Sequence, residues 1–266
     1  MRSLTQILLL VAASGSAVAA PAPIAPPPLV RMALPAPPAP PAPLPLSAME
    51  ARASEAEALG FVKAFSPSDL RREAEVGLLQ REFVLGLRRE PSAAEMLDTF
   101  PTLGDALTAA MVSQIDVYIE EYDGRFFPRA VDIARQSLSR DDVLKLTAFY
   151  RSALGRKVLS SVAARLDGKE FIDRALAGKG VDAGVARRQT LRAGMATYSA
   201  LAPDEKKQVL DVALSPAGRR FEAMMPQIVA LQVELANQPG PKFEAGAKAA
   251  MGVAFKRVTG TDPFTK

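Results

Sequence analysis

Two stretches of the chain decide its fold: LSRDDVLKLTAFYRSALGRKV at residues 138–158 and LAPDEKKQVLDVALSPAGRRF at residues 201–221. Placed at an offset of 63 residues, they carry the same kind of side chain at the positions that shape a helix and its ends. The matched pairs are Leu138 and Leu201, Asp141 and Asp204, Asp142 and Glu205, Leu146 and Val209, Ser152 and Ser215, Gly155 and Gly218, and Arg156-Lys157 and Arg219-Arg220. The sequence therefore predicts an internal duplication.

Each copy begins with signals for the start of a helix. Ser139 and Pro203 occupy the start, and acidic residues follow in the first turn, where they oppose the positive end of the helix dipole. These acidic residues are Asp141, Asp142, Asp204 and Glu205. An amphipathic helix of about ten residues is expected after each start.

Each copy ends in a predicted corner. Ser152 and Ser215 are placed to close the first helix and to cap the next one, and Pro216 takes a first-turn position where its missing N–H costs nothing. Gly155 and Gly218 lack a side chain where two helix backbones have to approach closely. We interpret each copy as a helix–corner–helix hairpin whose glycine serves packing, not catalysis.

The first copy resembles the periplasmic family known as domain of unknown function 2059. The matching residues are Asp141-Asp142, Phe149-Tyr150, Ser152, Gly155 and Arg156-Lys157. The second copy has Val212-Ala213 in place of the aromatic pair, so a role that needs the tyrosine is not expected there. The resemblance implies an all-helical domain and no known activity, substrate or cofactor.

Outward from this motif, apolar residues recur at helical spacing and no segment alternates as a strand does. The predicted fold class is all-α, a helical bundle of antiparallel hairpins. A long helix is expected from Leu103, broken or bent near Gly124 and Pro128. The other expected helices span 50–65, 70–89, 141–150, 154–166, 171–177, 184–200, 204–214, 217–237 and 243–258.

The N-terminal part predicts export. Residues 1–19 combine Arg2, an apolar run and small residues before the expected cut, as a secretory signal peptide does. Residues 20–46 form a proline- and alanine-rich spacer, residues 47–238 the helical domain, and residues 239–266 a C-terminal helix and tail. We expect a periplasmic protein with no stable membrane insertion after cleavage, although a retained leader would act as an anchor.

Composition excludes several chemistries. The chain has no cysteine and no histidine, so it cannot form a disulfide, a thiol nucleophile, an imidazole base or a common zinc cage. We therefore expect no catalytic residue, metal or cofactor. The formal net charge of +4 comes from scattered basic pairs, which does not favour a nucleic acid partner.

Two patterns leave a functional alternative open. Phe149 and Tyr150 line a ligand pocket or, as we prefer, seal the junction between two helices. Asp116, Glu120 and Asp123 share one helix face. We prefer to interpret it as a polar face in contact with solvent, and the alternative is a carboxylate site for a glycan or a cation.

Apolar stripes near the C-terminus allow a partner. The stripe of Phe221, Met224, Ile228, Leu231 and Leu235 is either core or a dimer face, and burial within one chain is preferred. The stripe of Phe243, Ala247, Met251, Phe255 and Val258 docks on the body or lies on an anionic membrane, and docking is preferred.

The predicted function is that of a non-enzymatic module that presents an apolar groove to a periplasmic protein, a peptide or an envelope component. The alternative is a peptidoglycan hydrolase or lyase that uses Asp116 or Glu120. Oligomeric state stays open, with a homodimer among the alternatives.

Overall fold

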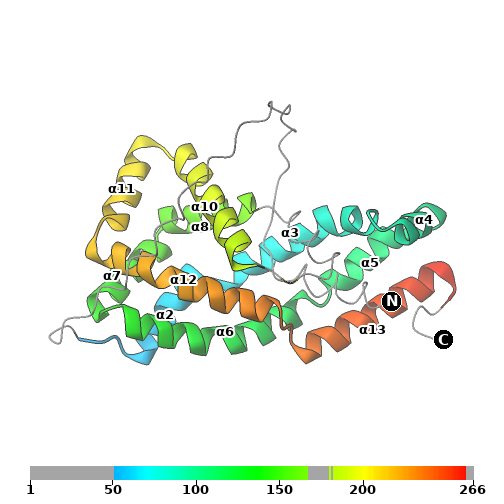
Figure 1. The fold of residues 1–266 in the computed structure, drawn as a ribbon, viewed down its shortest axis with the longest axis horizontal. Coiled ribbons are helices and arrows are strands. Elements are labelled where there is room, and N and C mark those ends of the chain that lie inside the picture. The colour runs from blue at the N-terminus through cyan, green and yellow to red at the C-terminus, as the bar shows by residue number, and fades with distance from the viewer. Residues whose placement is uncertain (1–50, 167–179, 181, 262–266) are drawn as a thin grey trace, which may run out of the picture.

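The computed structural model describes residues 51–166, 180 and 182–261, and within these ranges the chain is all-α (Figure 1). The described part contains no strand, only an isolated bridge between Arg52 and Ser139. Its helices are α2 (Glu55–Phe65), α3 (Ser68–Leu87), α4 (Pro91–Thr99), α5 (Leu103–Val112), α6 (Ile115–Ser137), α7 (Arg140–Arg151), α8 (Ala153–Arg165), α10 (Ala183–Ala200), α11 (Pro203–Ala213), α12 (Pro216–Ala236) and α13 (Pro241–Thr259). The predicted leader, the spacer and the expected helix at 171–177 lie outside the described residues. The predicted fold class is confirmed.

The expectation of one long helix from Leu103 is wrong. The helix ends at Val112 and a new one begins at Ile115, although the buried stripe runs across the break through Met111 and Ile115. At the break, the Ser113 hydroxyl donates to the Ala110 carbonyl at 2.6 Å. Such a side-chain bond competes with the backbone hydrogen bonds that would continue the helix.

The expected break near Gly124 and Pro128 does not occur, because α6 continues through both residues. Pro128 is exposed, as is Pro226 inside α12. A proline on the solvent side removes one backbone hydrogen bond and lets a helix bend without ending.

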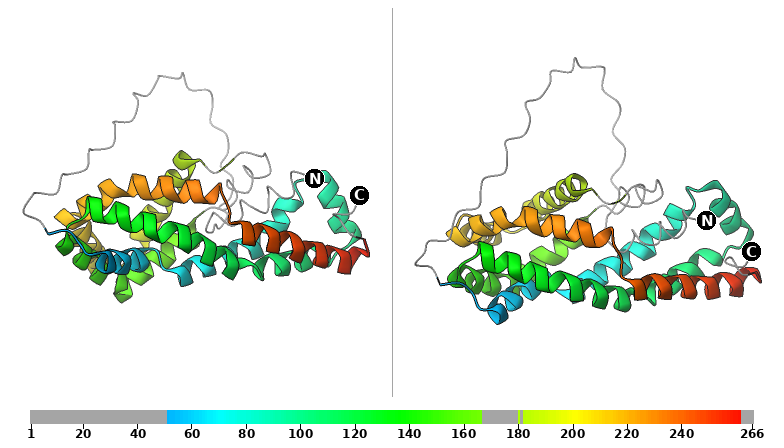
Figure 2. Two further views of the ribbon diagram at one scale, coloured as in Figure 1. Left: turned by 90° about the horizontal axis from the view of Figure 1, so that it is seen from below. Right: turned by 60° about the horizontal axis from the view of Figure 1, so that its bottom comes forward.

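The helices on either side of residues 167–181 form two units that pack reciprocally. The first unit is α6, α7 and α8, and the second unit is α10, α11 and α12. The first helix of each unit packs along the third helix of the other, α6 on α12 and α10 on α8 (Figures 1 and 2). Each unit thus contacts the other through both its first and its third helix.

Two ion pairs repeat the same exchange. Arg220 of the second unit donates to Asp142 of the first at 2.7 Å, and Lys157 of the first unit donates to Glu205 of the second at 2.7 Å. At the offset of 63 residues, Asp142 matches Glu205 and Lys157 matches Arg220. Both pairs therefore join positions that match at this offset, while the internal duplication itself stays a prediction.

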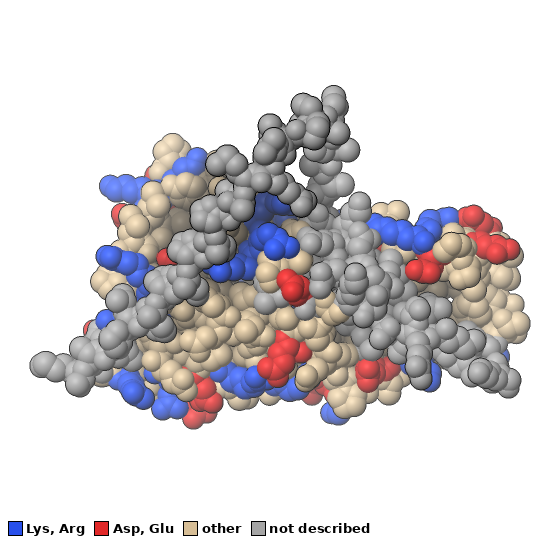
Figure 3. Space-filling view, in the orientation of Figure 1, with Lys and Arg blue, Asp and Glu red and all other residues tan. Residues whose placement is uncertain are grey.

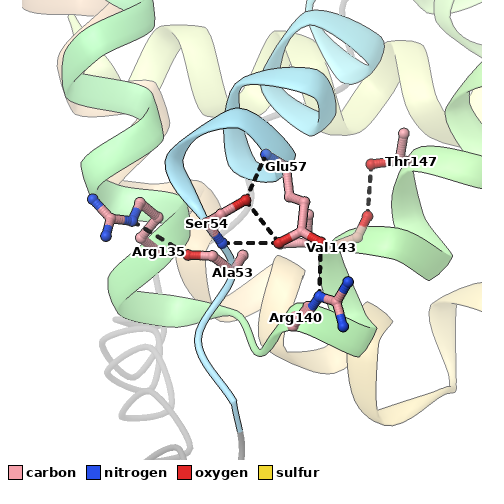
Figure 4. Close-up of polar contacts among 7 residues, drawn as sticks. All are labelled: Ala53, Ser54, Glu57, Arg135, Arg140, Val143 and Thr147. Atoms are coloured by element: carbon pink, nitrogen blue, oxygen red, sulfur yellow. Dashed lines mark hydrogen bonds and ion pairs between the residues drawn. The ribbon is translucent and has the colours of Figure 1, made fainter.

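Helix α2 covers the corner between α6 and α7 (Figure 4). Ser54 caps α2, and the Glu57 carboxylate accepts from the Ser54 backbone at 2.9 Å and from Arg140 at 2.7 Å. Hydrogen bonds from Ser54 and Arg140 lower the pKa of Glu57 to about 2. The start of α2 is thus tied to the start of α7.

The C-terminal helix α13 docks on α5 and α6. Glu121 of α6 caps it, accepting from the backbone N–H groups of Lys242 and Phe243 at 3.1 and 2.8 Å. A Cβ at Gly240 would lie 2.1 Å from a Glu121 carboxylate oxygen, so a larger residue there would displace the carboxylate that caps α13. Phe243, Ala247 and Met251 are buried in the main core, so docking on the body accounts for the stripe.

Candidate functional site: an apolar cavity between the two units

A cavity of about 400 Å³ lies between the two units and α3. Its volume falls within the range of about 300–1,000 Å³ that is typical of small-molecule sites. The third helices of both units line it at equivalent positions, since residues 158 and 162 of α8 and residue 166 directly after it match residues 221, 225 and 229 of α12 at the offset of 63. These residues are Val158, Val162 and Leu166, and Phe221, Met225 and Val229. The cavity is therefore a product of the reciprocal packing.

One wall of the cavity is aromatic. Tyr150 lies 6.3 Å from Phe65 and 5.7 Å from Phe221 between ring centroids, and Phe61 packs behind them at 5.2 Å from Phe65. Burial raises the pKa of Tyr150. The motif residue Tyr150 of α7 thus packs against rings of α2 and α12 and lines the cavity.

The two charged residues of the cavity, Arg71 and Glu75, both lie on α3. Glu75 of α3 is only 3% exposed, and one of its carboxylate oxygens has no hydrogen-bond partner. Burial raises the pKa of Glu75 well above its ordinary value, and the positive charge of Arg71 opposes this shift. A buried carboxylate without a full set of partners is costly, so this position calls for an explanation.

Arg71 is already engaged elsewhere. It forms an ion pair with Asp123 of α6 and donates to the Ser66 hydroxyl at 2.7 Å and the Ser66 carbonyl at 3.2 Å. Its guanidinium also lies over the Tyr122 ring, 4.6 Å from the centroid. The guanidinium is held on one edge of the cavity and makes no hydrogen bond with Glu75 among the contacts of the described residues.

Two further tyrosines complete this side. Tyr118 and Tyr122 of α6 lie 5.8 Å apart, and Tyr118 also contacts Phe243 of α13 at 5.3 Å. Burial raises the pKa of both phenols, and the negative charge of Glu75 adds to the shift at each. Both tyrosines stay protonated at neutral pH and can donate or accept a hydrogen bond inside the cavity.

The cavity reaches the surface at α10, where Thr190 lines it and is exposed. A second hollow of about 510 Å³ lies between α2 and α6. Its charged residues Glu55, Lys63 and Asp132 are exposed to solvent and Asp123 is paired with Arg71, so they need no ligand to satisfy them. The cavity between the units is the better candidate because it alone of these two contains a buried carboxylate oxygen without a partner.

The corner residues identified in the sequence have structural roles. Ser152 and Ser215 accept hydrogen bonds from the backbone N–H groups of Gly155 and Gly218 at 3.0 and 3.2 Å. A Cβ on Gly155 would lie 2.1 Å from the Phe149 carbonyl oxygen, so the close approach predicted at this glycine is present.

The acidic residues of the motif divide into two kinds. Asp142 and Glu205 accept from the backbone N–H of the residue before their helix, both at 3.0 Å, and join the reciprocal ion pairs. Asp141 and Asp204 are exposed, and Pro216 is an exposed first-turn residue of α12. None of these five residues lines the cavity.

The row of carboxylates on α6 does not form a cluster. Asp116 pairs with Arg72 at 2.5 Å and Asp123 pairs with Arg71, while Glu120 is exposed. A hydrogen bond from Arg72 lowers the pKa of Asp116. This carboxyl is therefore ionised at neutral pH and has no proton to donate as a general acid. Among the described residues, no group of three or more acidic side chains is arranged to hold a metal ion.

Sequence reasoning missed Glu75, although a signal was present. In the helix expected at 70–89, the apolar residues Val76, Leu79, Phe83 and Leu87 recur at helical spacing, yet Val76 is only half-buried. Glu75 lies four residues before Leu79 and eight before Phe83, so it occupies the buried face. An acidic residue in register with a core stripe is the pattern that would have identified it.

Comparison with known proteins gives no relative for this chain: no family model, curated protein or solved structure matches it. The resemblance to the family of domain 2059 therefore stays a prediction. Of the helices that the structure describes, none has the length and apolar character needed to cross a membrane.

Proposed function

We propose that this chain is an exported, non-enzymatic binding module whose ligand site is the cavity between the two units. The observation that carries the proposal is Glu75, a buried carboxylate with an unpartnered oxygen in the wall of an otherwise mainly apolar cavity. Folding gains nothing from leaving such a group unsatisfied, whereas a ligand that reaches it supplies the missing contact.

The character of the cavity favours binding over catalysis. Its polar residues are Arg71, Glu75, three tyrosines, Ser66, Gln232 and Thr190, and its other walls are aliphatic and aromatic. Sites for apolar ligands combine such walls with a few polar groups that fix orientation. Export to the periplasm, predicted from residues 1–19, would place the module among envelope components, which are rich in apolar chains.

The binding site can be tested by filling the cavity. The chain has no tryptophan, so the neutral dye N-phenyl-1-naphthylamine can be followed by fluorescence against a low background. We expect saturable binding to the wild-type protein and a loss of at least about tenfold in affinity, or 1.4 kcal/mol, for Ala163→Phe. Ala163 lines the cavity.

The matched control is Ala164→Phe, because Ala164 is the next residue of α8 and is exposed. This variant should bind the dye as the wild type does. Equal loss in both variants, or no saturable binding to the wild-type protein, would contradict the proposal. Circular dichroism of both variants checks that the helices are retained.

The alternative of a peptidoglycan hydrolase has less support. It requires Asp116 or Glu120 as an acid or base, but Asp116 is paired with Arg72 and Glu120 is exposed. Asp116→Asn combined with Glu120→Gln should leave dye binding unchanged. Peptidoglycan turnover by the wild type that this double variant abolishes would favour the hydrolase instead.

A further inference from the structure

The unpartnered oxygen of Glu75 narrows the chemistry of the ligand. Arg71 is the charged group next to it on α3, and the hydrogen bonds of Arg71 go to Asp123 and Ser66. Asp123 compensates the charge of Arg71, so the ionised form of Glu75 lacks a cation of its own. A ligand that carries one positive charge would restore the balance inside the cavity.

The aromatic residues around the cavity favour the same charge. Tyr118, Tyr122, Tyr150, Phe65 and Phe221 all line it, and aromatic faces attract cations through their quadrupoles. Arg71 over Tyr122 shows that a guanidinium already uses one of these faces. The other rings are free of a cation among the contacts of the described residues.

The remaining walls call for an alkyl chain. The cavity is lined by Val158, Leu159 and Val162 of α8, by Leu166 directly after it, and by Met225, Val229 and Val233 of α12. These seven side chains offer no hydrogen-bond partner, so the part of the ligand beside them must be apolar.

We infer that the cavity binds a cationic amphiphile, a molecule in which one alkyl chain ends in an ammonium group, with the chain between α8 and α12 and the ammonium at Glu75. This inference rests on the proposed binding function and adds the class of ligand. The ammonium donates to the free carboxylate oxygen and contacts the tyrosine rings, and the chain replaces water against the apolar walls.

Three probes that differ only in the head group test the inference: decylamine, decanol and decanoate, each titrated calorimetrically into the purified protein below its micelle concentration. Decylamine should bind at least about tenfold more tightly than decanol, a difference of 1.4 kcal/mol, and decanoate should bind most weakly. Glu75→Gln should remove the preference for the amine and leave the affinity for decanol unchanged.

The matched control is Glu73→Gln, the same substitution at an exposed position of α3 two residues away. It should keep the full preference for decylamine. If the wild type binds decanol or decanoate as tightly as decylamine, or if Glu75→Gln keeps the preference, the ligand class is wrong while the binding function stands. If none of the three probes binds, both proposals are contradicted.

Discussion

The α7–α8 hairpin and the α11–α12 hairpin have the same corner but different surroundings. The caps Ser152 and Ser215 have nearly identical backbone angles, with φ of −67° and −65° and ψ of 160° and 159°. Yet α7 buries Asp142, Val143 and Leu146, whereas α11 buries no residue. The comparison shows that local sequence sets the geometry of a corner, whereas the helices packed against it set how much the corner contributes to stability.

The difference arises from α2 and α12. Helix α7 packs against both, while α11 contacts its own successor α12 and leaves Leu210 and Leu214 exposed at 42% and 66%. Substitutions at equivalent positions of the two hairpins should therefore have unequal effects on the free energy of unfolding.

The largest difference is expected at the apolar position of the first helix in each hairpin. Leu146 is 1% exposed, so Leu146→Ala should lower the free energy of unfolding by about 3 kcal/mol. The equivalent Val209 is only half-buried, and Val209→Ala should cost less than about 1 kcal/mol. Urea unfolding followed by circular dichroism measures both, and equal costs would show that α11 is as well packed as α7.

The two ion pairs should differ for the same reason. The side chains of Arg220 and Asp142 are 15% and 8% exposed, so Arg220→Met should cost about 3 kcal/mol by leaving a buried carboxylate unpaired. Lys157 is 52% exposed in its pair with Glu205, and Lys157→Met should cost less than about 1 kcal/mol.

The contribution of the buried pair can be checked by measuring the free energy of unfolding as the pH is lowered. Burial raises the pKa of Asp142, but hydrogen bonds from Arg220 and Ser139 outweigh it and the net shift is downward. The pair therefore contributes its stability above the ordinary carboxyl pKa and loses it as the pH falls through the lowered value. In Arg220→Met, the free energy of unfolding should fall less than in the wild type as the pH is lowered. The same fall in both proteins would mean that the pair contributes little.

The corner glycines should differ by a smaller amount. A Cβ at Gly155 would lie 2.1 Å from the Phe149 carbonyl oxygen, and one at Gly218 would lie 2.2 Å from the Val212 carbonyl oxygen. Because α7 is held on both sides, Gly155→Ala should cost about 3 kcal/mol, whereas α11 can move outward and Gly218→Ala should cost about 1 kcal/mol. Thermal unfolding of the two variants would contradict this account if Gly218→Ala were the more damaging.

Much of the fold follows from the sequence because its signals are local. The caps, the glycines and the apolar periods predicted the helices of both units other than α6 within a few residues. Helix α4 was missed because only Leu97 is buried in it, so it has no stripe. The break at Ser113 was missed because the buried stripe continues across it, from Met111 to Ile115.

The site could not be predicted in the same way. The cavity forms where α8 and α12 meet α3, and the sequence separation between these helices hides which faces meet. The motif pointed to Tyr150, which does line the cavity. The register of Glu75 with the buried face of α3 indicates that it is buried, but which residues surround it depends on the packing of distant helices.

Glu75 should affect the pH dependence of stability in the opposite direction to Asp142. The folded pKa of Glu75 lies above its unfolded value, so its ionisation lowers stability as the pH rises from the unfolded pKa through the folded pKa. Glu75→Gln should be more stable than the wild type at pH 8 and similar to it at pH 4. Glu73→Gln should follow the wild type throughout, and a destabilised Glu75→Gln at pH 8 would show that the carboxylate is satisfied in the folded protein.

The reciprocal packing of the two units can be measured most directly by zero-length crosslinking of the unmodified protein. A carbodiimide joins an amine to a carboxylate only when they are in contact, and the Lys157 amine lies 2.7 Å from the Glu205 carboxylate. Peptide mass spectrometry should find a bond between Lys157 and Glu205 within one chain, absent in Lys157→Met. A Lys157 that links to other carboxylates and never to Glu205 would contradict the packing on which the cavity depends.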